Sequence, residues 1–301
     1  MLRSLIFSIS LALACASPSF SAAPAGNTPP QVGFAIIKTS QVAVMEGLLS
    51  PGGSFVKQVD SNFSAFLIKH RQDYLLFDTG MGSQVDGQYQ QCMPVWLRPF
   101  FKYDRPVLPA REQLRQAGMP PVQRVILSHS HWDHAGGVLD FPDAKIGVSA
   151  PELEVIRNPT TGPGGTWASQ VAATSIRWEV LEFTSGPFKG YAQSLDLYQD
   201  GTVVLVPMPG HTPGSIGLFV TADSGTVYFF IGDVAWTKAA VQVGAPKFWA
   251  AGMLVDNNAD QTQASVAQVR ALVQAEPELV VVPAHDSKVQ DALGYFPNWV
   301  K

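Results

Sequence analysis

Short apolar runs separated by turn-forming residues dominate the hydrophobic pattern of this chain. Runs of about 4–8 residues that are rich in branched and aromatic side chains are typical of buried β-strands. In the first part of the chain these runs are Val32–Ile37, Phe63–Lys69, Tyr74–Phe77, Val125–Leu127 and Lys145–Ser149. After residue 176 they are Ile176–Phe183, Thr202–Val206, Ile216–Val220, Thr226–Ile231 and Leu279–Val282. The second part is therefore expected to be mostly β-structure.

Some segments between these runs have the end signals or the apolar spacing of helices, so helices are predicted there. Pro109 suits the start of a short helix and Gly118 its end, and Pro151–Ile156 can begin another. A longer helix is expected at Thr262–Gln274, where four apolar residues share one face: Val266, Val269, Leu272 and Val273. Strands alternating with helices in this way indicate an α/β fold.

The composition fits one large domain. The chain has 301 residues, of which 46% are hydrophobic and 15% charged, so it can bury a large core. We expect residues 24–301 to form a single domain. A formal net charge of −4 without a clustered basic surface gives no reason to expect nucleic acid as a partner.

The N-terminal 23 residues resemble an export signal. Arg3 lies in a short basic start, an apolar stretch follows at residues 5–14, and small residues near 19–23 offer cleavage positions. The stretch is too short for a mature membrane span, so we expect a soluble periplasmic or secreted protein. A buried N-terminal helix and a lipoprotein acylated at Cys15 are the alternatives. Cleavage would leave Cys92 alone, without an internal disulfide.

The most informative stretch is the loop Ser128–Gly137, which directly follows an apolar run. Within six residues it contains three imidazoles and a carboxylate, at His129, His131, Asp133 and His134. Zn²⁺ and similar cations bind this mixture of nitrogen and oxygen ligands. A surface loop rich in histidine is the alternative, but the whole chain has only six histidines. The loop therefore predicts a metal site.

Three more potential ligands follow strand-like runs farther along the chain. His211 lies in Pro209–Gly214, Asp233 follows Val227–Gly232, and His285 follows Val280–Ala284. Strand ends that meet at one edge of a sheet would bring these side chains to the same place.

The combination of His-x-His-x-Asp-His with a later His, Asp and His resembles the metallo-β-lactamase-fold hydrolases over roughly residues 32–290. The resemblance implies an αββα sandwich with the metals at one edge. It also implies the ligands: His129, His131 and His211 for one metal, Asp133, His134 and His285 for the other, and Asp233 as the bridge. Two Zn²⁺ ions are expected, although iron or manganese can bind the same ligands. A hydroxide between the metals would attack the substrate, and Asp133 would orient it and carry its proton.

Asp78 resembles the acidic residue that this family places behind a metal-binding histidine, where a carboxylate would fix the tautomer of the histidine. An ordinary aspartate in the turn Asp78–Gly80 is the alternative. Residues 84–108, which contain Cys92 and several aromatic rings, either pack against the main body or form a lid over an apolar substrate.

The resemblance narrows the reaction class. His131 stands where redox di-iron relatives generally have Glu, and Asp233 stands at a position that true β-lactamases generally lack, so both favour another hydrolase. The segments Asp133–Gly137 and Pro209–Gly214 look like those of acyl-homoserine lactonases and of exported organophosphate hydrolases. The lactonases have a substrate-binding Tyr three residues after the bridging Asp. Here Trp236 stands there, either as a different donor or as packing.

Three hypotheses follow for a protein whose partner is a small-molecule substrate. The first is an exported dinuclear zinc hydrolase of a small ester or lactone, in which Asp133 and Asp233 are the catalytic carboxylates. The second is a phosphotriesterase of the organophosphate-hydrolase type, and the third is a metal-binding protein without turnover. The sequence does not fix the oligomeric state.

Overall fold

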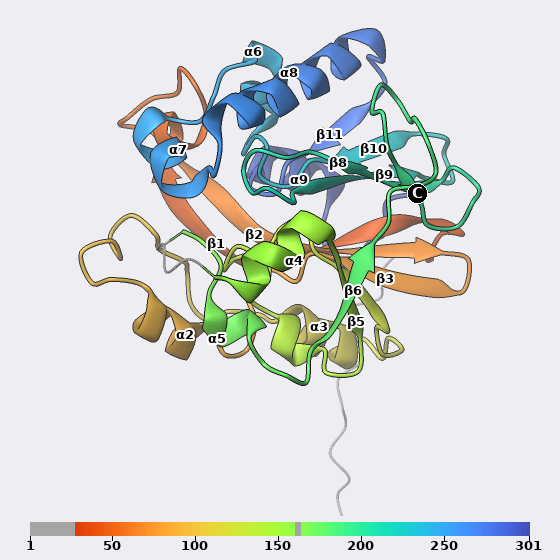
Figure 1. Ribbon diagram of the computed structural model, residues 1–301, viewed down its shortest axis with the longest axis horizontal. Coiled ribbons are helices and arrows are strands. Elements are labelled where there is room, and N and C mark those ends of the chain that lie inside the picture. The colour runs from red at the N-terminus through yellow and green to blue at the C-terminus, as the bar shows by residue number, and fades with distance from the viewer. Residues whose placement is uncertain (1–27, 160–163) are drawn as a thin grey trace, which may run out of the picture.

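The computed structural model describes residues 28–159 and 164–301 (Figure 1). The expected export signal at residues 1–23 lies outside them. Among the residues that are described, no helix combines the length and the apolar character that a membrane crossing requires.

In the described part of the chain, six strands form the first sheet in the order β1-β2-β3-β4-β5-β6. The strands are β1 (Val32–Met45), β2 (Gln58–His70), β3 (Asp73–Phe77), β4 (Arg124–Ile126), β5 (Lys145–Ser149) and β6 (Arg177–Leu181). Neighbours from β1 to β3 are antiparallel, whereas those from β3 to β6 are parallel.

The second sheet has five strands within the same residues, in the order β11-β10-β9-β8-β7. They are β7 (Leu195–Asp196), β8 (Val203–Pro207), β9 (Ile216–Thr221), β10 (Val227–Phe230) and β11 (Val280–Val282). Only β10 and β11 run parallel in this sheet as described. The strands predicted after residue 176 are therefore present. The expectation that this part is mostly β-structure was wrong, because helices at residues 238–243, 249–255, 259–275 and 287–293 hold more of its described residues than the strands do.

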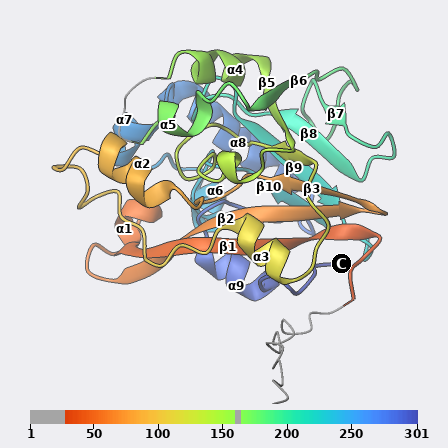
Figure 2. The ribbon, with the colours of Figure 1, turned by 90° about the horizontal axis from the view of Figure 1, so that it is seen from below.

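Helices cover the outer faces of both sheets (Figures 1 and 2). The helices are α1 (Glu46–Leu49), α2 (Val85–Cys92), α3 (Ala110–Gln116), α4 (Ala150–Arg157), α5 (Ala168–Val171), α6 (Lys238–Val243), α7 (Trp249–Val255), α8 (Ala259–Ala275) and α9 (Ser287–Leu293). Helices α3, α4 and α5 contribute side chains to the core outside the first sheet, and α6 and α8 to the core outside the second.

The alternation of side chains along the strands explains these layers. In β1, Phe34 and Ile36 pack into the core between the sheets, whereas Ala35 and Ile37 pack into the core under the helices. In β8, Leu205 likewise points between the sheets and its neighbours point outward. Both faces of each sheet are thus buried, because successive residues of a strand point to opposite sides. The αββα sandwich implied by the sequence resemblance is confirmed.

Strand β1 extends well beyond the apolar run that predicted it. Four polar residues at 38–41 interrupt the apolar run, yet pairing with β2 continues through them as far as Met45 opposite Gln58, with a register shift between Lys38 and Ser40. Main-chain hydrogen bonds do not depend on side-chain polarity, so the hydrophobic pattern ended the strand too early.

Residues 84–108 divide between packing and exposure. Tyr89, Met93 and Leu97 are buried in a cluster with Trp132, a residue of the loop that follows β4. Trp96, by contrast, is 71% exposed. Cys92 is half-buried and lies 3.4 Å from the hydroxyl of Ser169. Part of this segment therefore packs against the loop that follows β4.

Candidate metal centre

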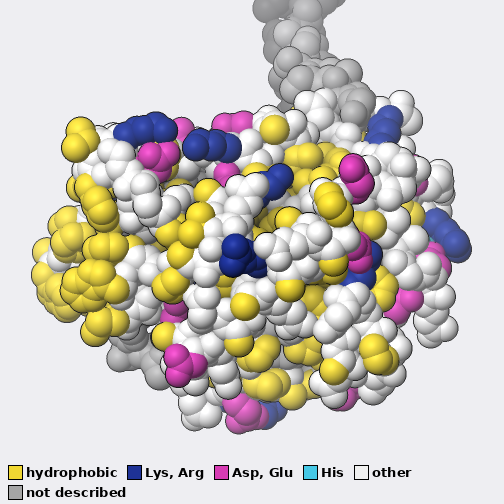
Figure 3. Space-filling model, turned by 90° about the horizontal axis from the view of Figure 1, so that it is seen from above, with side chains coloured by type: hydrophobic (Ala, Val, Ile, Leu, Met, Phe, Trp, Pro, Cys, Tyr) yellow, Lys and Arg dark blue, Asp and Glu magenta, His cyan; other side chains and the backbone are white. Residues whose placement is uncertain are grey.

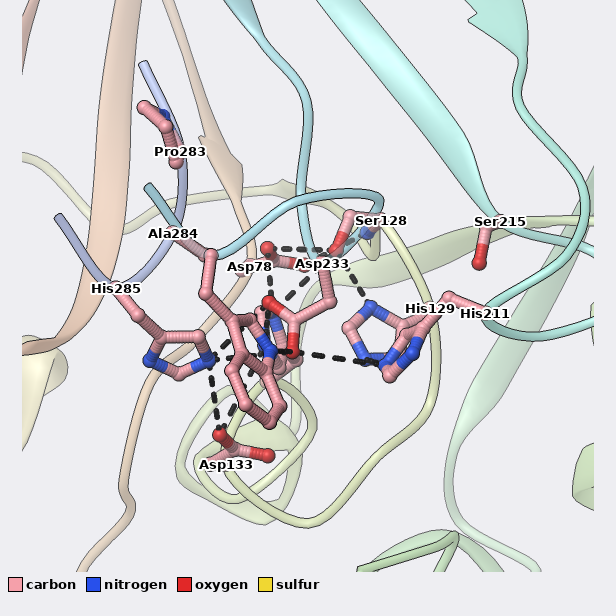
Figure 4. Close-up of polar contacts among 12 residues, drawn as sticks. Asp78, Ser128, His129, Asp133, His211, Ser215, Asp233, Pro283, Ala284 and His285 are labelled. Atoms are coloured by element: carbon pink, nitrogen blue, oxygen red, sulfur yellow. Dashed lines mark hydrogen bonds and ion pairs between the residues drawn. The ribbon is translucent and has the colours of Figure 1, made fainter. Parts of the chain in front are cut away.

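All seven predicted ligand residues come together at one edge of the sandwich, where strands of both sheets end. Figure 4 shows His129, Asp133, His211, Asp233 and His285 pointing toward one another there. The loop at residues 128–137 follows β4 of the first sheet. His211 follows β8, Asp233 follows β10 and His285 follows β11, all in the second sheet. The sixth histidine, His70, ends β2 and instead contacts Asp200.

Three imidazoles form one group of potential ligands. One ring nitrogen from each of His129, His131 and His211 lies within 4.8 Å of the others. The Nε2 atoms of His129 and His211 are 3.1 Å apart. All three side chains are buried, so a cation between them would be shielded from solvent.

Asp133, His134 and His285 form a second group with the same spacing. Asp233 lies between the two groups. Its Oδ1 is 3.2 Å from His134 Nε2 and 3.1 Å from His285 Nε2, whereas its Oδ2 is 3.5 Å from His211 Nε2. One carboxylate therefore reaches both groups, which is the arrangement that a bridging ligand requires.

Asp78 lies behind His134, where the sequence resemblance placed an acidic residue. It is fully buried and accepts hydrogen bonds from the backbone N–H of Ser128 at 2.7 Å and from its hydroxyl at 2.8 Å. It also accepts from His134 Nδ1 at 2.9 Å. Since the Ser128 hydroxyl donates to Asp78, its oxygen can accept from His129 Nδ1, 3.0 Å away. With Nδ1 engaged in this way, Nε2 of each imidazole faces the centre of the site.

The other two oriented histidines belong to loops of the second sheet. His285 Nδ1 donates to the backbone carbonyl of Asn62 at 2.8 Å. His211 Nδ1 donates to Asp256 at 2.7 Å, and Lys247 Nζ donates to the same carboxylate oxygen at 2.7 Å. Partners of this kind fix the tautomer and the ring orientation of metal-ligating histidines.

The charges of the site divide the histidines into two sets. Burial and the neighbouring imidazoles lower the pKa values of His129 and His131 well below the usual range, so both rings are neutral. Burial alone would also lower the pKa of His134, but Asp78 and Asp233 raise it well above its usual value. Burial opposes ionisation of Asp233 as well, yet the adjacent histidines lower its pKa. The ionised carboxylates of Asp78 and Asp233 therefore favour positive charge at the second group.

Two buried polar atoms support the fit of a metal directly. His134 Nε2 and Asp233 Oδ1 have no hydrogen-bond partner among the described residues, although they face each other. Buried polar atoms are normally paired. A cation held by a nitrogen lone pair and a carboxylate oxygen would satisfy both atoms, so the donor set fits metal ions.

Trp236 also contacts the carboxylate of Asp233. Its indole N–H donates to Asp233 Oδ2 at 2.8 Å, and its ring lies edge-on to the imidazole of His285. Lys247 Nζ lies 5.5 Å from the centre of the indole ring. The single N–H of Trp236 is therefore used within the protein.

Close backbone contact explains two glycines: Gly136, near the end of the loop after β4, and Gly82, in the segment after β3. A Cβ on Gly82 would lie 2.1 Å from the carbonyl oxygen of Gly136, and a Cβ on Gly136 would lie 2.8 Å from that of Gly80. The turn after β3 also holds the loop through Thr79, whose N–H and hydroxyl both donate to the carbonyl of His134. These contacts join the turn that carries Asp78 to the loop that carries the histidines.

Several residues that orient the ligands could not be identified from the sequence. Asn62 acts through its backbone, which no sequence pattern reveals. Asp256 and Lys247 were missed because the contacts that define them are long-range in the chain. A lone lysine in the apolar stretch from Ala245 to Val255 is a weak signal, since an unpaired charge is rarely buried there.

Comparison with known proteins gives consistent results. Residues 62–285 match the profile of the family described as the metallo-beta-lactamase superfamily. A probable metallo-hydrolase of Mycobacterium tuberculosis is 29% identical over 235 residues, which are 73% of each chain. The N-acyl homoserine lactonase AttM of Rhizobium radiobacter is 27% identical over 57% of this chain and 64% of its own. A solved N-acyl homoserine lactone hydrolase with N-hexanoyl-L-homoserine at its metal centre covers 91% of this chain and 100% of its own, with 17% identity and a TM-score of 0.68.

Proposed function

Because the chain belongs to the metallo-beta-lactamase superfamily, we propose that it is an exported dinuclear zinc hydrolase of a small ester or lactone. The observation that carries the proposal is the position of Asp233 between two groups of buried ligands. Imidazole nitrogen and carboxylate oxygen suit Zn²⁺, and iron or manganese would fit the same donors. Residues 24–301 would be the mature, single-domain enzyme.

Bound metal ions would supply a Lewis acid for the carbonyl oxygen of the substrate and lower the pKa of a water molecule. The residues of the chain do the remaining work. His129, His134, His211 and His285 are held as the tautomers that present Nε2 to the centre. Asp233 would hold the two groups together, because its carboxylate lies within 3.5 Å of His211 in the first group and within 3.1 Å of His285 in the second.

Asp133 is the carboxylate best placed to move a proton. Its side chain is 12% exposed, compared with 6% for Asp233, and its Oδ2 lies 3.4 Å from His285 Nε2. We propose that Asp133 orients the attacking water, accepts its proton and returns that proton to the leaving oxygen. Asp233 is less suited to this role because it is more buried and already accepts from Trp236.

The surface beside the centre supports a substrate with an apolar part. Helix α7 has no buried residue, and Trp249 and Met253 on it are 70% and 79% exposed. Phe248, just before α7, contacts Phe55, and hydrophobic side chains gather on this side of the molecule (Figure 3). Asp256 at the end of α7 bonds to His211, so this surface adjoins the ligands. Similarity to AttM favours a lactone with an acyl chain.

Trp236 favours the second candidate, a phosphotriesterase. Its N–H is donated to Asp233 and is not available to a substrate carbonyl. A broad indole ring beside the centre would suit an aryl leaving group.

Substitution of Trp236 by Tyr distinguishes the two activities. Losing one well-placed donor to the reacting oxygen can cost about 10²–10³ in kcat. If lactones are the substrates, Trp236→Tyr should raise lactone turnover relative to phosphotriester turnover. If phosphotriesters are preferred, it should leave lactones poor and raise KM for aryl phosphotriesters. Trp178→Tyr in β6, which packs under the helices, is the control, and equal effects of both changes would show that Trp236 only packs.

Turnover also tests the third possibility, a metal-binding protein without activity. The metal-loaded protein should hydrolyse at least one of a panel of acyl lactones, aryl esters, a phosphotriester, a β-lactam and a glutathione thioester. Failure on the whole panel, with both metals bound, would favour the non-catalytic alternative.

Export is tested separately, on protein from the native host. The mature chain should begin between about residues 20 and 26. Retention of Met1 would refute export, and acylation at Cys15 would indicate a lipoprotein.

A further inference from the structure

Glu152 is a buried carboxylate that the proposed mechanism does not use. It lies in the first turn of α4 and has no exposed surface. Burying a carboxylate is unfavourable unless hydrogen bonds replace its lost hydration. The contacts of Glu152 are therefore informative.

Its position in the helix would ordinarily explain it as a cap. Ser149 is the N-cap of α4 and its hydroxyl accepts from Glu152 N–H, so the two residues have the spacing of a capping box. In a capping box the glutamate side chain turns back to the N–H of the capping residue. Here the carboxylate instead accepts hydrogen bonds from two other segments. Capping therefore accounts for Ser149 but not for the side chain of Glu152.

These two segments carry the three imidazoles of the first ligand group. Oε1 of Glu152 accepts from the N–H of Ser130 at 2.7 Å and from its hydroxyl at 2.5 Å. Oε2 accepts from the hydroxyl of Thr212 at 2.6 Å. Ser130 stands between His129 and His131, and Thr212 directly follows His211. One carboxylate thus joins a loop of the first sheet to a loop of the second, immediately beside the ligands.

The backbone around Glu152 is fitted to the same junction. The Ser149 hydroxyl donates to the carbonyl of Gly214 at 2.7 Å. A Cβ on Gly214 would lie only 2.2 Å from Glu152 N. Glycine at this position lets the first turn of α4 touch the loop that carries His211. Contacts on both sides of the carboxylate therefore hold the two loops at a fixed distance.

We propose that Glu152 is a positioning residue that aligns His129 and His131 with His211 and so sets the affinity of the metal ion that these three hold. Because Glu152 accepts hydrogen bonds from Ser130, which lies between His129 and His131, it fixes the directions in which both rings leave the backbone. Its bond to Thr212 does the same for the neighbouring His211. The inference rests on the proposed function in one respect, namely that the three imidazoles bind a metal ion.

Two substitutions at Glu152 separate hydrogen bonding from charge. Glu152→Ala removes the acceptor for both loops. Glu152→Gln keeps a carbonyl oxygen for Ser130 and places an amide beside the Thr212 hydroxyl, which can turn to accept because Ser215 Oγ lies 2.8 Å away. Glu154→Gln is the matched control, since Glu154 lies on the exposed side of the same helix and pairs with Arg157.

The readouts are metal affinity and a spectrum, neither of which depends on activity. Competition with a chelator should show that Glu152→Ala binds one of its two Zn²⁺ ions about 10–100-fold more weakly. Glu152→Gln should recover most of this loss, and Glu154→Gln should match the wild type. The visible spectrum of the Co²⁺-loaded Glu152→Ala protein should resemble that of His211→Ala rather than that of His285→Ala, which identifies the weakened group.

Several results would overturn the proposal. Unchanged affinity for both ions, with only a lower unfolding temperature, would make Glu152 purely structural. Equal losses in the Ala and Gln variants would show that its hydrogen bonds do not act as described, and a spectrum like that of His285→Ala would place the effect at the wrong group. If Glu152→Ala does not fold, Thr212→Val should weaken the binding of the same ion. Wild-type affinity of Thr212→Val for that ion would equally refute the proposal. A wild-type protein that binds no metal would instead refute the proposed function.

Discussion

Asp78 offers a way to separate the folding of the site from its affinity for metal. It is fully buried, has a positive φ of 58°, and accepts hydrogen bonds from Ser128 and His134. Asp78→Asn keeps an oxygen for the Ser128 N–H and a side chain that tolerates the left-handed backbone conformation. It loses the second carboxylate oxygen, which accepts from His134. Asp78→Ala loses all of these.

Asp78→Ala should therefore mainly lower stability, whereas Asp78→Asn should mainly lower metal affinity. Asp78→Ala leaves the Ser128 N–H buried and unpaired, which costs about 1–3 kcal/mol, and strains the backbone by about 1–2 kcal/mol. Its free energy of unfolding should fall by about 2–5 kcal/mol in the metal-free protein. Asp78→Asn keeps the bond to the Ser128 N–H and should lose less stability than Asp78→Ala, but its affinity for one ion should fall about 10–100-fold, because His134 is no longer oriented.

Urea unfolding of the metal-free protein measures the first effect, and competition with a zinc chelator measures the second. Asp143→Asn, in an exposed turn, is the control for an Asp-to-Asn change and should alter neither quantity. Wild-type affinity of Asp78→Asn for both ions would show that Asp78 does not act through His134.

Two further predictions concern the stability of the fold rather than metal affinity. Burial alone would raise the pKa of Asp200, but hydrogen bonds from Thr202 and His70 lower it to about 2 from the usual 3.8. A carboxylate whose pKa is lower in the folded than in the unfolded protein stabilises the fold above the unfolded pKa, and this stabilisation is lost as the pH falls to the folded pKa. In urea unfolding, the wild type should therefore be more stable than Asp200→Asn above about pH 4, and the difference in unfolding free energy should vanish towards pH 2. Gly82→Ala should lose at least about 1–3 kcal/mol because its Cβ would meet the Gly136 carbonyl, whereas Gly87→Ala, with open space on α2, should be neutral or stabilising by thermal unfolding. An equal response of the two glycines, or a pH-independent effect of Asp200→Asn, would contradict these explanations.

Much of the fold could be predicted from the sequence because its signals are local. Apolar runs such as Tyr74–Phe77 and Lys145–Ser149 correspond to β3 and β5 with the same or nearly the same bounds. The predicted helix Thr262–Gln274 lies within α8. Helix α7 was missed because it has no buried face and hence no periodic pattern. The pairing of the two sheets could come only from the family resemblance, since periodicity does not specify which strands meet.

The candidate site shows the same division. The ligand residues could be proposed because histidines are rare in this chain and the first four predicted ligands, three histidines and one aspartate, lie within one loop. The partners that orient them could not, because Asp256 is 45 residues from His211 and the Asn62 carbonyl is 223 residues from His285. Trp236 was recognised as a departure from the lactonase pattern. That its N–H is donated to Asp233 follows from side-chain directions, which the sequence does not contain.

We propose that this chain is a dinuclear metal-dependent hydrolase in which Asp233 serves both ions. The most direct test is elemental analysis of the purified mature protein, combined with its turnover, for the wild type and for Asp233→Ala. We predict close to two transition-metal ions per chain in the active wild type, and a joint loss of metal and activity in the variant. A fully active wild-type enzyme with a single ion per chain would rule out the dinuclear mechanism.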